Sequence, residues 1–142
     1  MSDFELAAPC GLYCGVCTRY RAIGEPDLAE KLARAMGKSV EAVKCRGCRA
    51  EKGLPGGDPI CATWACVQRK RVEFCYECAD FPCPMLQPVA AAAPPYPHNI
   101  KLYNLCRIKA IGVEHWAEDE AATIRRRYFE GKFVVGQGPV LE

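Results

Sequence analysis

The clearest pattern of apolar and polar positions lies in the last third of the chain. Apolar residues recur at helical spacing from His98 to Gly112, and a second such run follows from Val113 to Gly131. Both runs predict helices. The residues expected to face the core are Ile100, Tyr103, Leu105, Ile108, Ile111, Trp116, Ala121, Ile124 and Tyr128.

The segment 26–45 carries a shorter helical pattern. Leu28 and Leu32 belong to an apolar stripe, Asp27 has the side chain of an N-cap, and Gly37 is suited to end the helix. A second short helix is expected to begin after a serine cap a few residues later. The segment 62–72 predicts another short helix, with a tryptophan on its packing side.

Glycine and proline interrupt the rest of the chain, so few regular elements are expected there. The predicted fold class is mainly α, with little or irregular β, in a small metal-stabilised, cysteine-rich domain with C-terminal helices. We expect one domain over residues 1–140, with the cysteine clusters in 1–93 and the helical part in 94–140. Residues 141–142 have the character of a cloning scar.

Composition narrows the class of protein. The 142 residues include 11 cysteines, and the beginning, MSDFELAAP, has neither the basic nor the apolar region of a secretory signal. No stretch approaches the roughly 20 apolar residues of a membrane span. We therefore expect a cytoplasmic protein without a membrane segment, whose cysteines serve as metal ligands or redox thiols rather than as disulfides.

Three C-x2-C pairs give the strongest chemical signal, at residues 14–17, 45–48 and 75–78. Two intervening residues let a tight turn direct both sulfurs at one ion, and a four-cysteine zinc site commonly combines two such pairs. Cys106, in the middle of a predicted helix, is expected to be a packed thiol. The candidate metal ligands are the other cysteines, namely Cys10, Cys14, Cys17, Cys45, Cys48, Cys61, Cys66, Cys75, Cys78 and Cys83.

Two zinc ions account most simply for these cysteines. The first site is predicted to use Cys14, Cys17, Cys45 and Cys48. The second is predicted to use Cys75, Cys78 and Cys83, with either Cys66 or Cys61 as the fourth ligand. Cys10 is then a spare thiol or replaces a ligand in the first site.

Zinc is the expected metal, and an iron–sulfur cluster is the alternative because four thiolates suit both. The C-x3-C-x2-C spacing at residues 10–17 matches the cluster motif of radical S-adenosylmethionine enzymes. This chain is too short for their barrel, however, and Val16 stands where that motif usually has an aromatic residue. Neither His98 nor His115 lies in a catalytic zinc motif, so a structural role is favoured.

The combined motifs CGLYCGVCTRY, CRGCR, FCYECADFPCPML, a Tyr-Asn pair and IGVEHW carry a resemblance. From about Cys10 to about Trp116, the chain resembles a bacterial and archaeal family known as domain of unknown function three-seven-nine-five. That resemblance implies a cysteine-rich protein suspected of binding zinc or iron, and it implies no activity. The cysteines that fall on the family's positions are Cys10, Cys14, Cys17, Cys45, Cys48, Cys66, Cys75, Cys78 and Cys83.

Two classes of function remain open. In the first, zinc holds a scaffold whose surface binds a protein or a nucleic acid, with basic residues such as Arg125–Arg127 available. The formal charge of +2 does not itself favour nucleic acid, because each site of four thiolates and one divalent ion would add −2. In the second, an iron–sulfur cluster or a reactive cysteine serves a redox protein or enzyme. No nucleophile–base pair is evident, which disfavours an enzyme.

Overall fold

The computed structural model describes residues 1–57 and 59–140, except for the side chains of residues 138–140. Helices make up most of the regular structure, so the predicted mainly helical class is confirmed. Residues 141–142, the predicted cloning scar, lie outside the described residues. Among the helices of the described chain, none has both the length and the apolar content that a membrane crossing requires.

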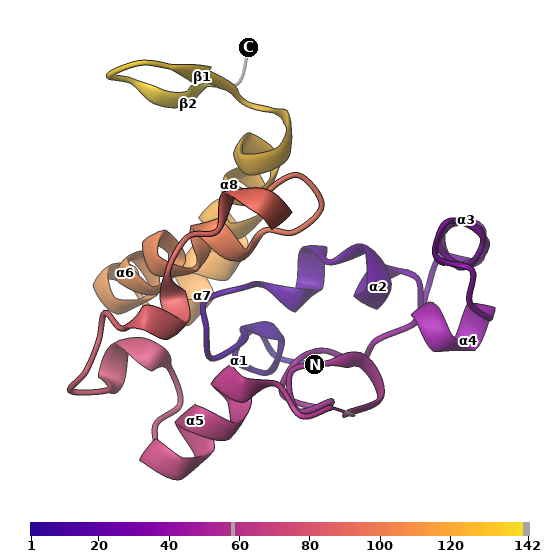
Figure 1. Ribbon diagram of the computed structural model, residues 1–142, viewed down its shortest axis with the longest axis horizontal. Helices are drawn as coiled ribbons and strands as arrows, with labels where there is room; N and C mark the ends of the chain where they lie inside the picture. The colour runs from indigo at the N-terminus through magenta and orange to yellow at the C-terminus, as the bar shows by residue number, and fades with distance from the viewer. Residues whose placement is uncertain (58, 141–142) are drawn as a thin grey trace.

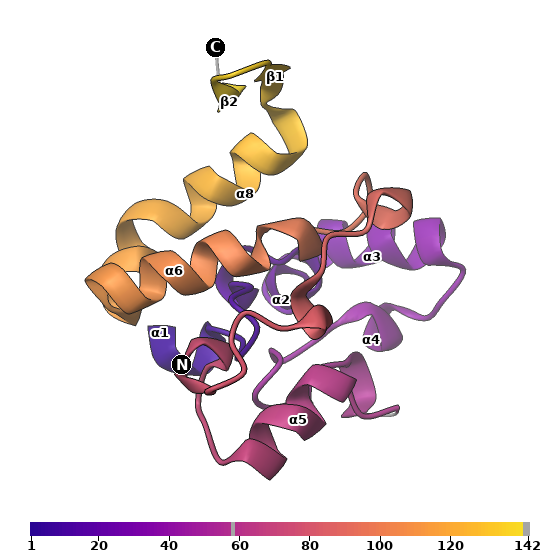
Figure 2. The same ribbon diagram turned by 60° about the vertical axis from the view of Figure 1, so that its left-hand side comes forward.

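The C-terminal helices form two arms that meet at a sharp turn (Figure 2). The first arm is α6 (Lys101–Ile111), preceded by a 3-10 turn at His98–Ile100. Gly112 lies between the end of α6 and the start of α7 (Val113–His115). Its φ is 85°, and glycine suits this position because an L side chain is strained in that conformation. A π-helical segment, Trp116–Glu120, then leads into α8, which spans Ala121–Glu130.

The core lies where α6 and α7 pack on the N-terminal segment and on the chain around the third cysteine pair. Trp116 and Leu105 are fully buried in it. Residues from both predicted parts of the chain, 1–93 and 94–140, contribute to this core. The single-domain organisation stays a prediction. Its buried members are Ala7, Ala8, Cys10, Phe74, Leu86, Leu105, Ile108, Val113, Trp116, Ala117 and Ala121.

Two residues of α6 do not pack as predicted. Tyr103 and Cys106 are both exposed, so the expected packed thiol at Cys106 is wrong. The helix turns a different stripe inward, which includes the polar residue Asn104. Asn104 is tolerated there because its amide nitrogen donates to the Gly11 carbonyl at 2.7 Å.

The predicted insert forms α3 (Pro26–Met36) and α4 (Val40–Val43), which lie side by side at one flank of the molecule (Figure 1). Gly37 ends α3 in the left-handed conformation, as predicted. The predicted cap at Asp27 is wrong, since the helix begins one residue earlier at Pro26 and leaves Asp27 in its first turn.

Three further helices position the cysteine segments. They are α1 (Asp3–Leu6), α2 (Thr18–Arg21) and α5 (Ala62–Lys70). The predicted helix at 62–72 is thus confirmed, with an earlier end because Arg71 adopts a left-handed conformation. Short 3-10 turns occupy Cys14–Val16, Cys75–Glu77, Pro84–Leu86 and Ala90–Ala92.

A C-terminal β-hairpin was not expected from the sequence. Strand β1 (Lys132–Val134) pairs antiparallel with β2 (Gly138–Val140). The hairpin projects from the end of α8, away from the rest of the chain (Figure 1). The described side chains of β1 are all exposed. A strand is recognised in a sequence by alternating apolar and polar residues, and that alternation arises only where one face of the strand is buried.

Candidate metal centres

Each C-x2-C pair forms a tight turn around its sulfur atoms. The amide of Cys17 donates to the Cys14 carbonyl at 2.9 Å, and the amide of Cys78 donates to the Cys75 carbonyl at 3.2 Å. In the middle pair, the Gly47 amide donates to the Cys45 sulfur at 3.5 Å. Such turns present two thiols on the same side and supply N–H groups that stabilise thiolates.

The first predicted site brings together pairs that are distant in sequence. The backbone amide of Cys48 donates to the sulfur of Cys14 at 3.2 Å. The Cys48 thiol and this amide lower the pKa of Cys14 to about 7, and the nearby positive charge of Arg49 acts in the same direction. The hydrogen bonds from Cys48 thus favour the thiolate form of Cys14, which is the form that binds metal.

Cys45 and Cys17 belong to the same neighbourhood. Burial chiefly raises the pKa of the Cys45 thiol, and the negative charges of Glu51, Cys14 and Cys17 add to the increase. Repulsion among thiolates that share a site has this effect until a cation is present. The predicted set of Cys14, Cys17, Cys45 and Cys48 is thus gathered in one region.

The second predicted site surrounds a small cavity of about 30 Å³ beneath α5. That volume is enough for one small occupant such as a water molecule or an ion. The sequence left the fourth ligand open, and the cavity is lined by Cys66, whereas Cys61 lies beside Gly53. The cysteines around the cavity are Cys66, Cys75, Cys78 and Cys83.

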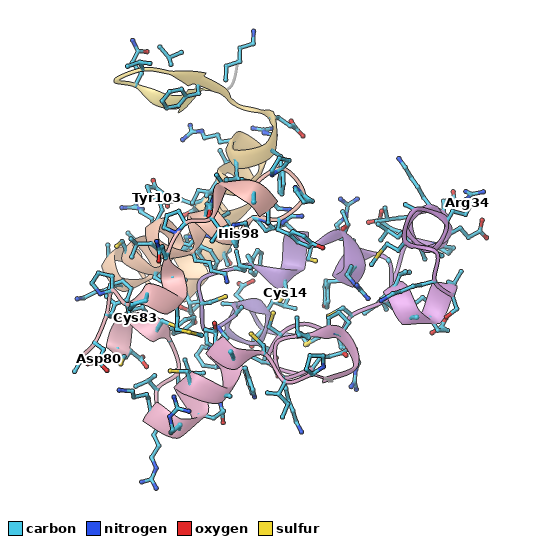
Figure 3. The ribbon with its side chains drawn as sticks, viewed as in Figure 1. Cys14, Arg34, Asp80, Cys83, His98 and Tyr103 are labelled. Atoms are coloured by element: carbon cyan, nitrogen blue, oxygen red, sulfur yellow. The ribbon has the colours of Figure 1, made fainter. Side chains whose placement is uncertain are left out.

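The thiols around this cavity oppose one another's ionisation, and the cationic side chain of Lys70 also lines the cavity. Burial chiefly raises the pKa of Cys75 to about 12, and Cys10, Cys83 and Cys66 add their negative charges. At the rim, the Cys78 thiol lies 3.9 Å from a carboxylate oxygen of Asp80, which is paired with Lys70 at 2.6 Å. Figure 3 places Cys83 and Asp80 on the same side of the molecule, with Cys14 nearer its middle.

Cys10 lies between the two groups rather than at the surface. Its side chain is part of the core, and burial chiefly raises the pKa of its thiol. Cys61 and Cys14 are near enough to raise it further, and Cys10 has the same effect on Cys48 and Cys75. Its role as a spare thiol or a ligand remains a prediction.

Arg49 links the N-terminal segment, the second cysteine pair and the segment before the third cysteine pair. Its guanidinium donates to the carbonyls of Phe4 and Ala7 and to both the carboxylate and the carbonyl of Glu73. The amide of Cys75 also donates to the Pro9 carbonyl at 2.9 Å. The sequence did not predict this bridging role of Arg49, because neither its position after Cys48 nor its residue type signals three distant backbone partners.

The donor chemistry fits a thiophilic metal. Among the described residues, no three His, Cys, Asp or Glu side chains converge closely enough to form a ready-made metal site. The two gathered sets nevertheless consist of thiols only, which suit zinc or iron. His98 lies apart, with its Nε2 atom 2.9 Å from the Val89 carbonyl, and His115 and Cys106 are exposed.

A family model described as "Protein of unknown function (DUF3795)" matches residues 6–88, which is more than half of the chain. That range contains both gathered cysteine sets and ends before the Tyr-Asn pair and the IGVEHW stretch. Comparisons with curated proteins and with solved structures gave no match. The chain therefore belongs to the DUF3795 family of proteins of unknown function.

Proposed function

We propose that the protein binds two zinc ions through cysteine-only sites that stabilise its fold. The observation that carries the proposal is the small cavity lined by four thiols, with room for one ion. The amide of Cys48 on the sulfur of Cys14 supports the other site. The proposed sets are Cys14, Cys17, Cys45 and Cys48, and Cys66, Cys75, Cys78 and Cys83.

The proposed role of the metal is structural. Catalytic zinc sites usually keep an open position and include histidine or carboxylate ligands, whereas sets of four thiolates close the coordination sphere. The segments that carry these cysteines contain short turns and few buried side chains. A metal ion joining two such turns adds the binding free energy to the stability of the fold.

Metal analysis of protein purified without air tests this proposal. Two zinc ions per chain and a colourless solution are expected. Visible absorption from bound iron would favour the iron–sulfur alternative and overturn zinc. Cys45→Ser and Cys78→Ser should each reduce the zinc content by one ion, whereas Cys106→Ala should retain both because Cys106 is exposed on α6. Unchanged zinc in both serine variants would contradict the proposed sites.

A cytoplasmic interaction module is the biological role that we propose for the metal-held domain. The C-terminal half of α8 carries adjacent arginines, and the guanidinium of Arg125 lies 5.0 Å from the centre of the Phe129 ring. Arg126 and Arg127 are exposed beside it. Arginine combined with an aromatic ring is a common way of binding single-stranded nucleic acid, which favours nucleic acid over protein as the partner.

Fluorescence anisotropy with a labelled single-stranded oligonucleotide tests the partner. Binding should weaken steeply as salt increases, and Arg126→Glu should weaken it further. Arg34→Glu on α3 is the matched control for net charge. A flat salt dependence, or equal losses in the two variants, would contradict nucleic acid as the partner. A protein captured specifically through α8 would then support the protein version of the module.

A further inference from the structure

A second cavity, larger than the thiol-lined one, lies elsewhere in the molecule. It is an open cavity with a volume of about 680 Å³, lined by residues of the α3–α4 insert and of the turn that follows Cys45. Cavities of about 300–1,000 Å³ are typical of small-molecule sites. Of the proposed zinc ligands only Cys45 lines this cavity, and the proposed interaction surface on α8 lies outside its lining.

Three cationic side chains line the cavity, each from a different local segment. Lys38 follows α3, Lys44 follows α4, and Arg46 lies within the second cysteine pair. Among the described residues, no hydrogen bond or ion pair engages the Lys38 ammonium group. Positive charges that converge on a cavity from separate segments favour an anionic occupant.

The two carboxylates at the cavity do not cancel this preference. Glu51 accepts hydrogen bonds from the amides of Arg46 and Gly56, and only 9% of its side chain is exposed. It also lies 3.4 Å from Nε of Arg46, so Arg46 is partly neutralised and Lys38 is the cation without a partner carboxylate among the described residues. Glu41 pairs with Lys44 at 2.6 Å, but 81% of its side chain is exposed. Such a surface pair contributes little free energy, so an incoming anion can replace Glu41.

The remaining lining is apolar. Ile23 is a large hydrophobic side chain left about half exposed at the cavity, and Pro55 and Ala42 also belong to the lining. An exposed isoleucine gains free energy when a ligand removes it from water. We propose that this cavity binds a small organic anion, a carboxylate or a phosphate monoester that carries an apolar group.

The anionic group is assigned to the side of Lys38 and Lys44, and the apolar group to Ile23 and Pro55. The proposal does not depend on the identity of the metal, although Cys45 lies at the cavity and belongs to the proposed first zinc site. Occupancy of the cavity and zinc content are therefore separate measurements. If the protein contains its zinc but binds no small anion, only the cavity proposal is contradicted.

Nuclear magnetic resonance titration of the zinc-loaded protein tests the inference, with phenyl phosphate and benzoate as probes. At least one probe should shift the backbone signals of Lys38, Ala42 and Lys44 in a saturable manner. Benzyl alcohol, which is neutral, should cause much smaller shifts. No saturable shift from either anion, or shifts centred on another part of the molecule, would overturn the proposal.

Charge-reversal variants give the second readout. Lys38→Glu should weaken binding about tenfold or more, as expected for the loss of a charge-assisted hydrogen bond. Arg34→Glu changes the net charge equally and lies on the outer flank of α3 (Figure 3), so it should bind the probe normally. Equal weakening by both variants would mean diffuse attraction only and would overturn the site.

A vesicle-binding experiment distinguishes a free small anion from a lipid headgroup as the occupant of the cavity. Vesicles that contain phosphatidate should not bind the protein through this cavity. The protein could instead co-sediment with those vesicles, lose that binding in Lys38→Glu, and show no response to phenyl phosphate. That result would overturn the small-molecule proposal in favour of a membrane ligand. Zinc content and the amide spectrum of each variant, measured without probe, establish that the fold is intact.

Discussion

The guanidinium of Arg49 lies 2.8 Å from the carboxylate of Glu73 and joins the second cysteine pair to the third. Arg49 directly follows Cys48, and Glu73 lies two residues before Cys75. Only 13% of the Arg49 side chain is exposed, whereas Glu73 is 62% exposed. The bonds from Arg49 to backbone carbonyls and its packing between the Phe4 and Phe74 rings therefore matter more than the ion pair.

Replacing Arg49 by methionine is expected to lower the free energy of unfolding by about 1–3 kcal/mol, because the carbonyl of the buried Ala7 loses its donor and the contacts of the guanidinium with the Phe4 and Phe74 rings are lost. Urea denaturation of the zinc-loaded protein, followed by circular dichroism, measures this. Arg69→Met is the matched control, since Arg69 is exposed on α5. A loss below about 0.5 kcal/mol, the range of ordinary surface substitutions, would contradict the role given to Arg49.

Gly11, within the first cysteine motif, is expected to tolerate no side chain. Its φ is 89°, and an added Cβ would lie 2.7 Å from the Lys101 carbonyl and 2.9 Å from Cγ of Leu105. Gly11→Ala should therefore cost about 2 kcal/mol or more, through backbone strain and crowding against α6. Gly24→Ala, where the nearest atom is 4.0 Å away, is the control. Equal thermal midpoints for the two variants would refute the close packing at Gly11.

The longer helices, α3, α5, α6 and α8, were predictable because each one has buried residues, whereas the short helices α1 and α2 were not predicted and α2 buries none. Leu105, Ile108 and Trp116 lie at helical spacing and form the core as expected. Tyr103 and Cys106 were misplaced because the edges of an apolar stripe are poorly defined. Asn104 lies one position from Tyr103, about 100° around the helix, and it is buried where it donates to the distant Gly11 carbonyl. The hydrophobic pattern therefore does not predict the burial of a polar side chain whose hydrogen-bond partner is distant in sequence.

The cysteine pairs were predictable from spacing alone, since two intervening residues define the turn at each pair. Their assignment to sites depends on contacts between segments far apart in sequence. The amide of Cys48 reaches Cys14 across 34 positions, and Arg49 reaches Glu73 across 24. Neither contact has a local sequence signal, which explains why the sequence alone does not choose between Cys66 and Cys61. The structure places Cys66 at the cavity, and its role as a ligand stays a prediction.

Tyr13 should make stability depend on pH in the alkaline range. Burial, together with a 2.6 Å hydrogen bond to Asp3, raises the pKa of the Tyr13 phenol above its ordinary value of 10. Since the unfolded chain ionises first, this stabilisation is complete below pH 10 and is lost as the pH rises further. Compared with Tyr13→Phe, the unaltered protein should be about 1 kcal/mol more stable at pH 8.

The difference between the two proteins should shrink steadily above pH 10, as measured by urea denaturation at each pH. Tyr96→Phe removes a hydroxyl from a side chain that is 62% exposed and serves as the control. Its stability should follow that of the unaltered protein at every pH. A constant difference for Tyr13→Phe across the alkaline range would show that its hydroxyl is not coupled to folding in this way.

Cys66 and Cys61 should differ in their effect on zinc content, although they lie on and next to the same short helix. Cys66 lines the 30 Å³ cavity with three other thiols, whereas Cys61 precedes α5 and packs against Gly53. Cys66→Ser should therefore release one zinc ion per chain during dialysis against a weak chelator, because a hydroxyl replaces a thiolate ligand.

Cys61→Ser should retain both ions under the same conditions, and the zinc content of each variant is measured by elemental analysis. Serine keeps the size of the side chain in both cases, so any difference reports on the ligand rather than on packing. The reverse outcome, with zinc lost only from Cys61→Ser, would move the fourth ligand to Cys61 and place the second ion nearer to Cys10, whose thiol responds to the charge of Cys61. Equal retention by both variants would remove α5 from the metal centre.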